Sequence, residues 1–161
     1  MRPQTGWLKV NIDGSFDALS EKGGIGIVMR DWEGRVIFAS CKTLNSCHSA
    51  LEAELVACRE GIALALQWTL LPVQVETDCL VALQMIQAKE VERSELAFAV
   101  REIKDLLAGS RECLLRKVHR SQILVSHMLA NKSRSENLSG FWCENDCTFI
   151  SKLVIDDIIP E

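Results

Sequence analysis

The 161-residue sequence lacks a long hydrophobic run, and no apolar stretch approaches the roughly 20 residues that a helix needs to cross a bilayer. We therefore expect no membrane association. The start, Met1-Arg2-Pro3-Gln4-Thr5-Gly6, lacks the apolar segment of a signal peptide, so we expect an intracellular protein. Internal repeats and low-complexity tracts are also absent.

The sequence also lacks the cysteine pattern of a disulfide or zinc framework. Its seven cysteines are an odd number, scattered along the chain, and several fall within apolar segments. We interpret them as thiols in a reducing compartment, the nucleus or the cytoplasm. Cys143 and Cys147 are close in sequence, but no second Cys/His pair follows them, and a structural zinc needs four ligands.

Excess positive charge is absent as well, because the formal net charge is −4. This value argues against a general nucleic-acid binder. The charge is unevenly distributed: residues 135–161 hold six acidic residues and one basic residue, whereas residues 101–134 hold eight basic and three acidic residues. The basic stretch either faces a phosphate backbone or forms a solvated helix surface.

The length suits one domain with a hydrophobic core. Apolar periodicity and turn residues predict five strands and four helices. The strands are expected at 7–13, 25–30, 35–41, 73–77 and 112–118, and the helices at 50–66, 79–88, 95–108 and 121–131.

The predicted order gives an α/β fold with three layers. The first three strands form an antiparallel meander, and the last two arrive through helices and so lie parallel to the first. We expect a mixed five-stranded sheet with helices on both faces. Residues 7–134 form this domain, and residues 135–161 form a linker and a short acidic helical segment at 149–158.

Local signals also predict turns and helix starts. Gly23 and Gly24 end a polar stretch and predict the turn between the first two strands. Ser49 and Glu52 have the spacing of a capping box. Asp78 and Ser121 are expected to cap the helices that follow them.

Three acidic residues stand in apolar surroundings: Asp13 and Asp78 on strand-like runs, and Glu54 in an apolar helix. A buried, unpaired carboxylate costs several kcal/mol, and a metal ion commonly offsets this cost for a cluster. Three unrelated surface acids are the alternative. The strands that carry Asp13 and Asp78 are expected to be neighbours, and the helix that carries Glu54 should pack across them. We therefore expect the three carboxylates to meet at one site that binds two Mg²⁺ ions, with Mn²⁺ as the alternative metal.

Four short motifs around these residues occur in the order found in one enzyme family. They are Ile12-Asp13-Gly14-Ser15, Gly24-Ile25-Gly26-Ile27-Val28-Met29-Arg30, Ala53-Glu54-Leu55-Val56-Ala57 and Val75-Glu76-Thr77-Asp78. Through them, residues 7–130 resemble an RNase H domain, and most closely the reverse-transcriptase-related RNase H-type domains of plants. Each motif alone is weak, but together, in this order and at these distances, they are specific.

The resemblance implies a metal-dependent endonuclease that cleaves the RNA strand of an RNA–DNA hybrid. Asp13 and Asp78 would flank the metals, and Glu54 would bind one of them near the substrate's 2′-hydroxyl. Glu52 is the rival of Glu54, but a spacing of two residues places them on nearly opposite helix faces. The expected partner is an RNA–DNA hybrid, and we expect a monomer.

The sequence departs from the family pattern on the last predicted helix. His127 stands where active members usually carry a fourth acidic residue, and Ile123 stands where an Asn usually touches the substrate. An imidazole is a poorer ligand for Mg²⁺ and a better one for Mn²⁺ or Zn²⁺. His127 is thus either a fourth catalytic residue or a partly buried polar residue. A weakened domain that binds nucleic acid or protein remains the alternative function.

Overall fold

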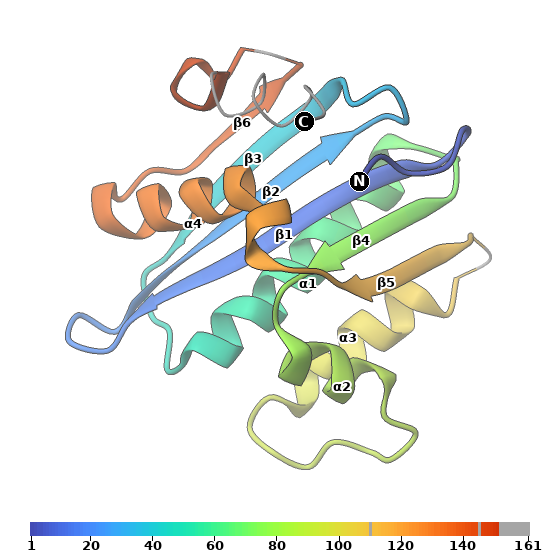
Figure 1. The fold of residues 1–161 in the computed structure, drawn as a ribbon. Coiled ribbons are helices and arrows are strands. Elements are labelled where there is room, and N and C mark those ends of the chain that lie inside the picture. Colours follow the sequence, from blue (N-terminus) through green and yellow to red (C-terminus); the bar gives the residue numbers. More distant parts are fainter. Residues whose placement is uncertain (110, 145, 152–161) are drawn as a thin grey trace.

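The computed structural model describes residues 1–109, 111–144 and 146–151, which form a single mixed sheet with helices on both faces (Figure 1). Three consecutive antiparallel strands, β1, β2 and β3, build its centre. β4 and β5 lie parallel to β1, and β6 lies antiparallel to β3. The strand order is β5-β4-β1-β2-β3-β6. The strands are β1 Leu8–Asp17, β2 Lys22–Arg30, β3 Val36–Leu44, β4 Val73–Thr77, β5 Cys113–Lys117 and β6 Gly140–Cys143.

The helices complete the three layers that the sequence predicts. One face of the sheet is covered by α1, with α2 and α3 beside it, and the other face by α4 (Figure 1). The helices are α1 Ala50–Trp68, α2 Leu80–Gln87, α3 Ala97–Leu107 and α4 Leu124–Glu136, with short 3-10 helices η1 at Arg120–Gln122 and η2 at Thr148–Ile150. In the described part of the chain, no helix has the length and hydropathy needed to span a membrane.

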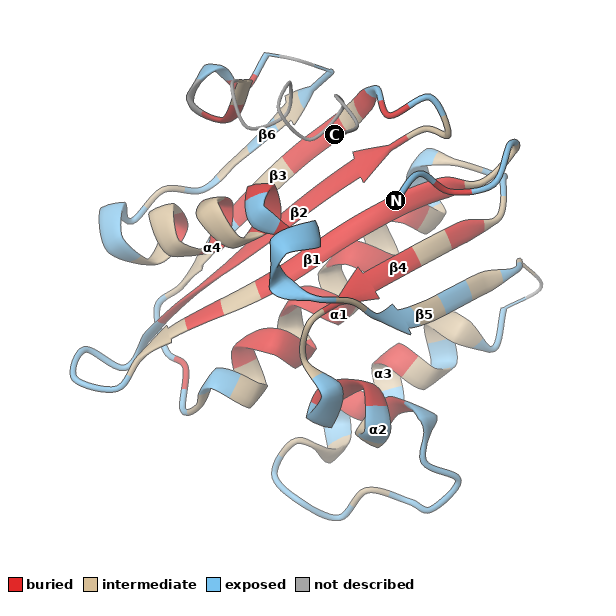
Figure 2. Cartoon of the chain, viewed as in Figure 1, coloured by how far each residue is buried: buried red, intermediate tan, exposed pale blue. Residues whose placement is uncertain are grey.

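β1 lies in the middle of the sheet, and most of its residues are therefore buried on both faces (Figure 2). Val10 and Ile12 pack in the core cluster that includes Leu55 and Ile62 of α1. Because successive side chains of a strand point to opposite faces, Asp13 points toward the α4 side. The fold thus places a buried acidic side chain on the central strand.

The predicted turn at Gly23 and Gly24 is wrong, because both residues lie within β2. The turn is shorter, and Glu21 adopts a positive φ of 53° there. These glycines serve packing: a Cβ on Gly24 or Gly26 would collide with the backbone of α4. α4 therefore lies close to the sheet, and this close approach requires glycine on β2. The Gly-Gly pair reflects packing and not a turn.

The segment after residue 134, expected to begin with a linker, contains regular structure. α4 continues to Glu136, and Asn137 ends it with a left-handed φ of 54°. A hydrogen bond ties this polar part of α4 to the sheet: the Thr43 hydroxyl of β3 donates to the Ser133 carbonyl oxygen at 2.9 Å. β6 then adds a sixth strand to the predicted five. Most of the helix expected at 149–158 lies outside the described residues.

Candidate metal site

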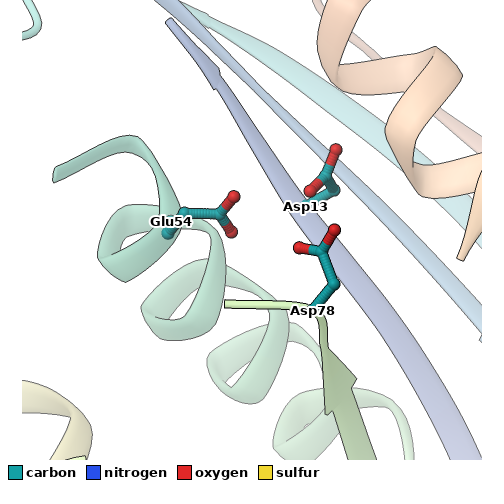
Figure 3. A group of neighbouring side chains, drawn as sticks. All are labelled: Asp13, Glu54 and Asp78. Carbon is teal, nitrogen blue, oxygen red and sulfur yellow. The ribbon is translucent and has the colours of Figure 1, made fainter. Parts of the chain in front are cut away.

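The carboxylates of Asp13, Glu54 and Asp78 converge on one point at the edge of the β1–β4 pair (Figure 3). One oxygen from each lies within 4.8 Å of the others. The register explains the meeting of the two aspartates. Asn11 on β1 pairs with Glu76 on β4, so Asp13 and Asp78, each two residues further along, come level just past the end of β4.

Glu54 reaches the same point from the first turns of α1. Its Oε2 accepts a hydrogen bond from the Gly14 backbone N–H at 3.3 Å. α1 can come this close because residue 14 is glycine: a Cβ there would lie 2.5 Å from the carbonyl carbon of Ala53. Gly14 in the first motif thus admits the helix that carries the third carboxylate.

Glu52 belongs to the start of α1 and not to the carboxylate cluster. The Ser49 hydroxyl accepts from the Glu52 N–H at 3.0 Å, as the capping-box spacing predicts. The reciprocal bond is shifted by one residue, because the Glu52 carboxylate accepts from the His48 N–H at 2.7 Å. Of the two rival glutamates, only Glu54 faces Asp13 and Asp78.

Burial raises the pKa of two of the three carboxyl groups, Glu54 and Asp13. Burial, together with the charges of Asp13 and Asp78, raises the pKa of Glu54 to about 9. Burial also raises the pKa of Asp13, although the hydrogen bond with His127 opposes the change. Glu54 therefore holds a proton at neutral pH until a cation arrives, and a divalent ion would displace that proton.

Asp78 has a different partner from the one that the sequence predicts. The cap of α2 is the Cys79 thiol, whose Sγ accepts from the Ala82 N–H at 3.5 Å. Asp78 instead accepts a hydrogen bond from Nε of Arg120 in η1 at 2.8 Å. The side chain of Arg120 is 57% exposed, so a cation stands at the open rim of the cluster. Its position in the connection after β5, at the same sheet edge, was the signal available in the sequence.

His127 lies beside the cluster, as its place in the family pattern predicts. Its Nδ1 is 2.6 Å from Oδ2 of Asp13, and its Nε2 is 3.0 Å from Nδ2 of Asn131. Ile123 is only 1% exposed and packs into the interior. Its apolar side chain offers no hydrogen bond at the position where an Asn is expected from the family pattern.

Ser121 does not cap α4 as expected. It lies inside η1, whose N-cap is His119, and Ile123 precedes the first turn of α4 without a side-chain cap. The 3-10 turn is what directs Arg120 toward Asp78. The segment that was predicted as the start of one helix therefore forms a short 3-10 turn, η1, followed by α4.

The cluster fits a hard divalent cation. Oδ1 of Asp13 is buried and has no hydrogen-bond partner among the described residues, which is a costly state for a carboxylate oxygen unless a cation satisfies it. All three side chains offer carboxylate oxygens, the ligands that Mg²⁺ and Mn²⁺ prefer. The residues present therefore fit a magnesium-type site.

Several solved RNases H have the same fold. LC11-RNase H1, isolated from compost, superposes with a TM-score of 0.74 at 18% identity, covering 84% of this chain and 100% of that one. RNase H1 from the archaeon Halobacterium salinarum gives a TM-score of 0.73 at 17% identity, with coverage of 81% and 99%. LC11-RNase H1 in complex with an RNA/DNA hybrid gives 0.71 at 17%, with coverage of 82% and 99%. A search of curated protein sequences gave no match.

The chain has the RNase H fold. Residues 11–133 match the sequence model of the Reverse transcriptase-like family. The matched segment begins two residues before Asp13 and extends past His127, so it includes every carboxylate of the cluster. The chain belongs to this family.

Proposed function

We propose that the domain is a metal-dependent endonuclease that hydrolyses the RNA strand of RNA–DNA hybrids. The observation that carries the proposal is the convergence of Asp13, Glu54 and Asp78 around the unpaired Oδ1 of Asp13. The similarity to an RNase H1 that was solved with an RNA/DNA hybrid supports the choice of substrate.

Mg²⁺ bound by Asp13, Glu54 and Asp78 would supply an activated water and neutralise charge on the oxygens of a phosphodiester. The residues of this chain would hold and orient the metal. Asp13 and Asp78 present oxygens from two adjacent strand ends, and Glu54 approaches from α1. Arg120, exposed at the rim, would attract the substrate phosphate once a metal replaces it at Asp78.

A cleavage assay with a matched pair of variants tests the proposal. The substrate is an RNA–DNA hybrid labelled on the RNA strand, incubated with Mg²⁺ and separately with Mn²⁺. Glu54→Gln should abolish cleavage, because a metal ligand is lost. Glu52→Gln, two residues away on the same helix, should cleave as the wild type does, because Glu52 only bonds to the helix start. Equal loss in both variants would contradict the assignment of Glu54.

A second candidate is a weakened domain that binds hybrid or a protein partner without cutting. His127 at the fourth acidic position favours it, because one carboxylate fewer holds the cation. The two candidates separate in a binding measurement on the same hybrid. Hybrid binding without cleavage in either metal would support the second candidate and overturn the first.

A further inference from the structure

A chain of hydrogen bonds links Arg134 to the carboxylate cluster. His127, Asn131 and Arg134 are spaced by four and three residues on α4, so they share one helix face. That face lies against Asp13 and Ser15, which are two residues apart on β1 and share one strand face. The periods of the helix and the strand thus bring five polar side chains into one line.

The first link fixes the direction of the proton at Ser15. Nε of Arg134 donates to Oγ of Ser15 at 2.8 Å, and a guanidinium can only donate. Ser15 is therefore an acceptor toward Arg134, and its own proton is available for another partner. That partner is Oδ1 of Asn131, at 2.7 Å.

The next link fixes the tautomer of His127. Since the Asn131 oxygen faces Ser15, its Nδ2 faces Nε2 of His127 at 3.0 Å. The amide nitrogen donates, so Nε2 must accept and carries no proton. The proton of the neutral ring then sits on Nδ1, which is 2.6 Å from Oδ2 of Asp13. A carboxylate accepts, so both ends of the chain agree.

The opposite arrangement satisfies fewer groups. If the Asn131 amide were turned over, the Ser15 hydroxyl would accept from both Arg134 and Asn131, and its proton would lose this acceptor. His127 would then need protons on both ring nitrogens to donate to Asn131 and to Asp13. One direction of donation, from Arg134 through to Asp13, uses every group once.

We propose that His127 is a positioning residue and not a metal ligand. Asn131, Ser15 and Arg134 hold it as the Nδ1–H tautomer, and it orients Asp13 by donating to Oδ2. This rests on the proposed function, because it assigns Oδ1 of Asp13, the oxygen without a partner, to the metal. Both nitrogens of His127 are engaged, so the imidazole adds no softer ligand and the site remains a carboxylate site suited to Mg²⁺.

Nitrogen-15 spectra of the histidine rings test the tautomer without reference to activity. In metal-free wild type near neutral pH, His127 should show a pyrrole-type Nδ1 and a pyridine-type Nε2, assigned by their loss in His127→Asn. Adding Mg²⁺ should leave that pattern unchanged. A doubly protonated ring, a proton on Nε2, or a metal-induced change at either ring nitrogen would overturn the proposal.

Asn131→Leu tests the hold on the ring, with Lys132→Met as the matched control on the next residue of the helix. Lys132 binds Glu136 on the exposed side of α4. Asn131→Leu should let the two tautomers exchange, and should raise the Mg²⁺ concentration for half-maximal cleavage about 10-fold with a smaller effect on kcat. Lys132→Met should change neither. An unchanged tautomer in Asn131→Leu would contradict the role of Asn131.

The spectra test the positioning role of His127, and the cleavage assay tests the nuclease activity, so the two can fail separately. A fixed Nδ1–H tautomer in a protein that fails to cleave hybrid supports the positioning role and overturns the nuclease. Hybrid cleavage together with direct binding of the metal to a ring nitrogen of His127 supports the nuclease and overturns the positioning role. The wild-type spectra alone decide the tautomer if Asn131→Leu does not fold.

Discussion

At the scale of single residues, three different interactions offset the negative charge of the carboxylate cluster. Glu54 keeps a proton because burial and its acidic neighbours raise its pKa to about 9. Asp78 is paired with the Arg120 guanidinium, and Asp13 accepts a hydrogen bond from His127. A divalent cation would replace the Glu54 proton and the Arg120 guanidinium, so metal binding should release a proton and displace Arg120, whereas the hydrogen bond between His127 and Asp13 stays in place.

The raised pKa of Glu54 predicts how metal-free stability changes with pH. Between 4.5 and about 9, the folded chain holds a proton on Glu54 that the unfolded chain has released. Stability falls with rising pH wherever the folded state binds more protons, so the free energy of unfolding should decrease across this window. Glu54→Gln should flatten this decrease and stabilise the metal-free protein by about 1–3 kcal/mol at about pH 8.

Urea unfolding of both proteins in a chelator, at several pH values, measures this effect. Glu52→Gln serves as the control, because Glu52 lies outside the cluster. A wild-type stability that rises from about pH 5 to about pH 9 would contradict a buried proton on Glu54.

Arg120 competes with the cation for Asp78. Arg120→Met should therefore tighten Mg²⁺ binding, by about 2- to 5-fold because an exposed ion pair contributes less than about 1 kcal/mol. The same change should weaken binding of the hybrid, since a cation facing phosphate is lost. Calorimetric titration with Mg²⁺ measures the first effect. Weaker Mg²⁺ binding in Arg120→Met would show that the guanidinium supports the metal.

The sequence predicted the three carboxylates because each stands in a short motif, and it placed His127 by its position in the family pattern. The sequence places Arg120 in the connection after β5, at the same sheet edge, but its contact with Asp78 depends on the 3-10 turn, which the sequence did not predict. Asn131 and Arg134 share a helix face with His127, but their partner Ser15 lies more than a hundred residues away. Such pairings depend on tertiary packing and leave no local pattern.

At the scale of elements, the site depends on how closely two helices approach the sheet. Gly14 admits α1, and Gly26 admits α4, whose backbone would collide with a Cβ there. Gly26→Ala should lower the free energy of unfolding by about 1–3 kcal/mol, because the helix must move outward. Gly109→Ala is the matched control, since its Cβ would meet only a carbonyl oxygen at 3.4 Å. Similar thermal unfolding of the two variants would contradict the close approach of α4.

The five predicted strands and four predicted helices are present. The errors of the prediction concern where these elements begin and one additional short strand. Gly23 and Gly24 read as a turn but serve the packing of α4. Ser121 reads as a cap but lies inside a 3-10 turn. β6 has only four residues, fewer than the roughly 5–6 of a typical strand, so its alternation is too short to detect.

At the scale of the whole molecule, β6 joins the end of the described chain to the core. Phe141 stacks on Phe38 and on Trp68, with ring centroids 5.1 Å and 5.5 Å away. Phe141→Ala should lower the free energy of unfolding by about 1–2 kcal/mol without splitting the transition. Phe98→Ala, at a site that is 68% exposed, should have little effect. Two separate transitions in tryptophan fluorescence would show that β6 folds apart from the domain.

The central claim is that three carboxylates, without a fourth acid, suffice for metal-dependent hydrolysis of RNA in a hybrid. The most direct measurement is cleavage of an RNA–DNA hybrid in Mg²⁺ by wild type and by Asp13→Asn, with the label on the RNA strand and then on the DNA strand. We expect the wild type to cut only the RNA strand, and Asp13→Asn to cut neither while remaining folded. An uncut hybrid in both Mg²⁺ and Mn²⁺, or equal cutting by Asp13→Asn, would contradict the account.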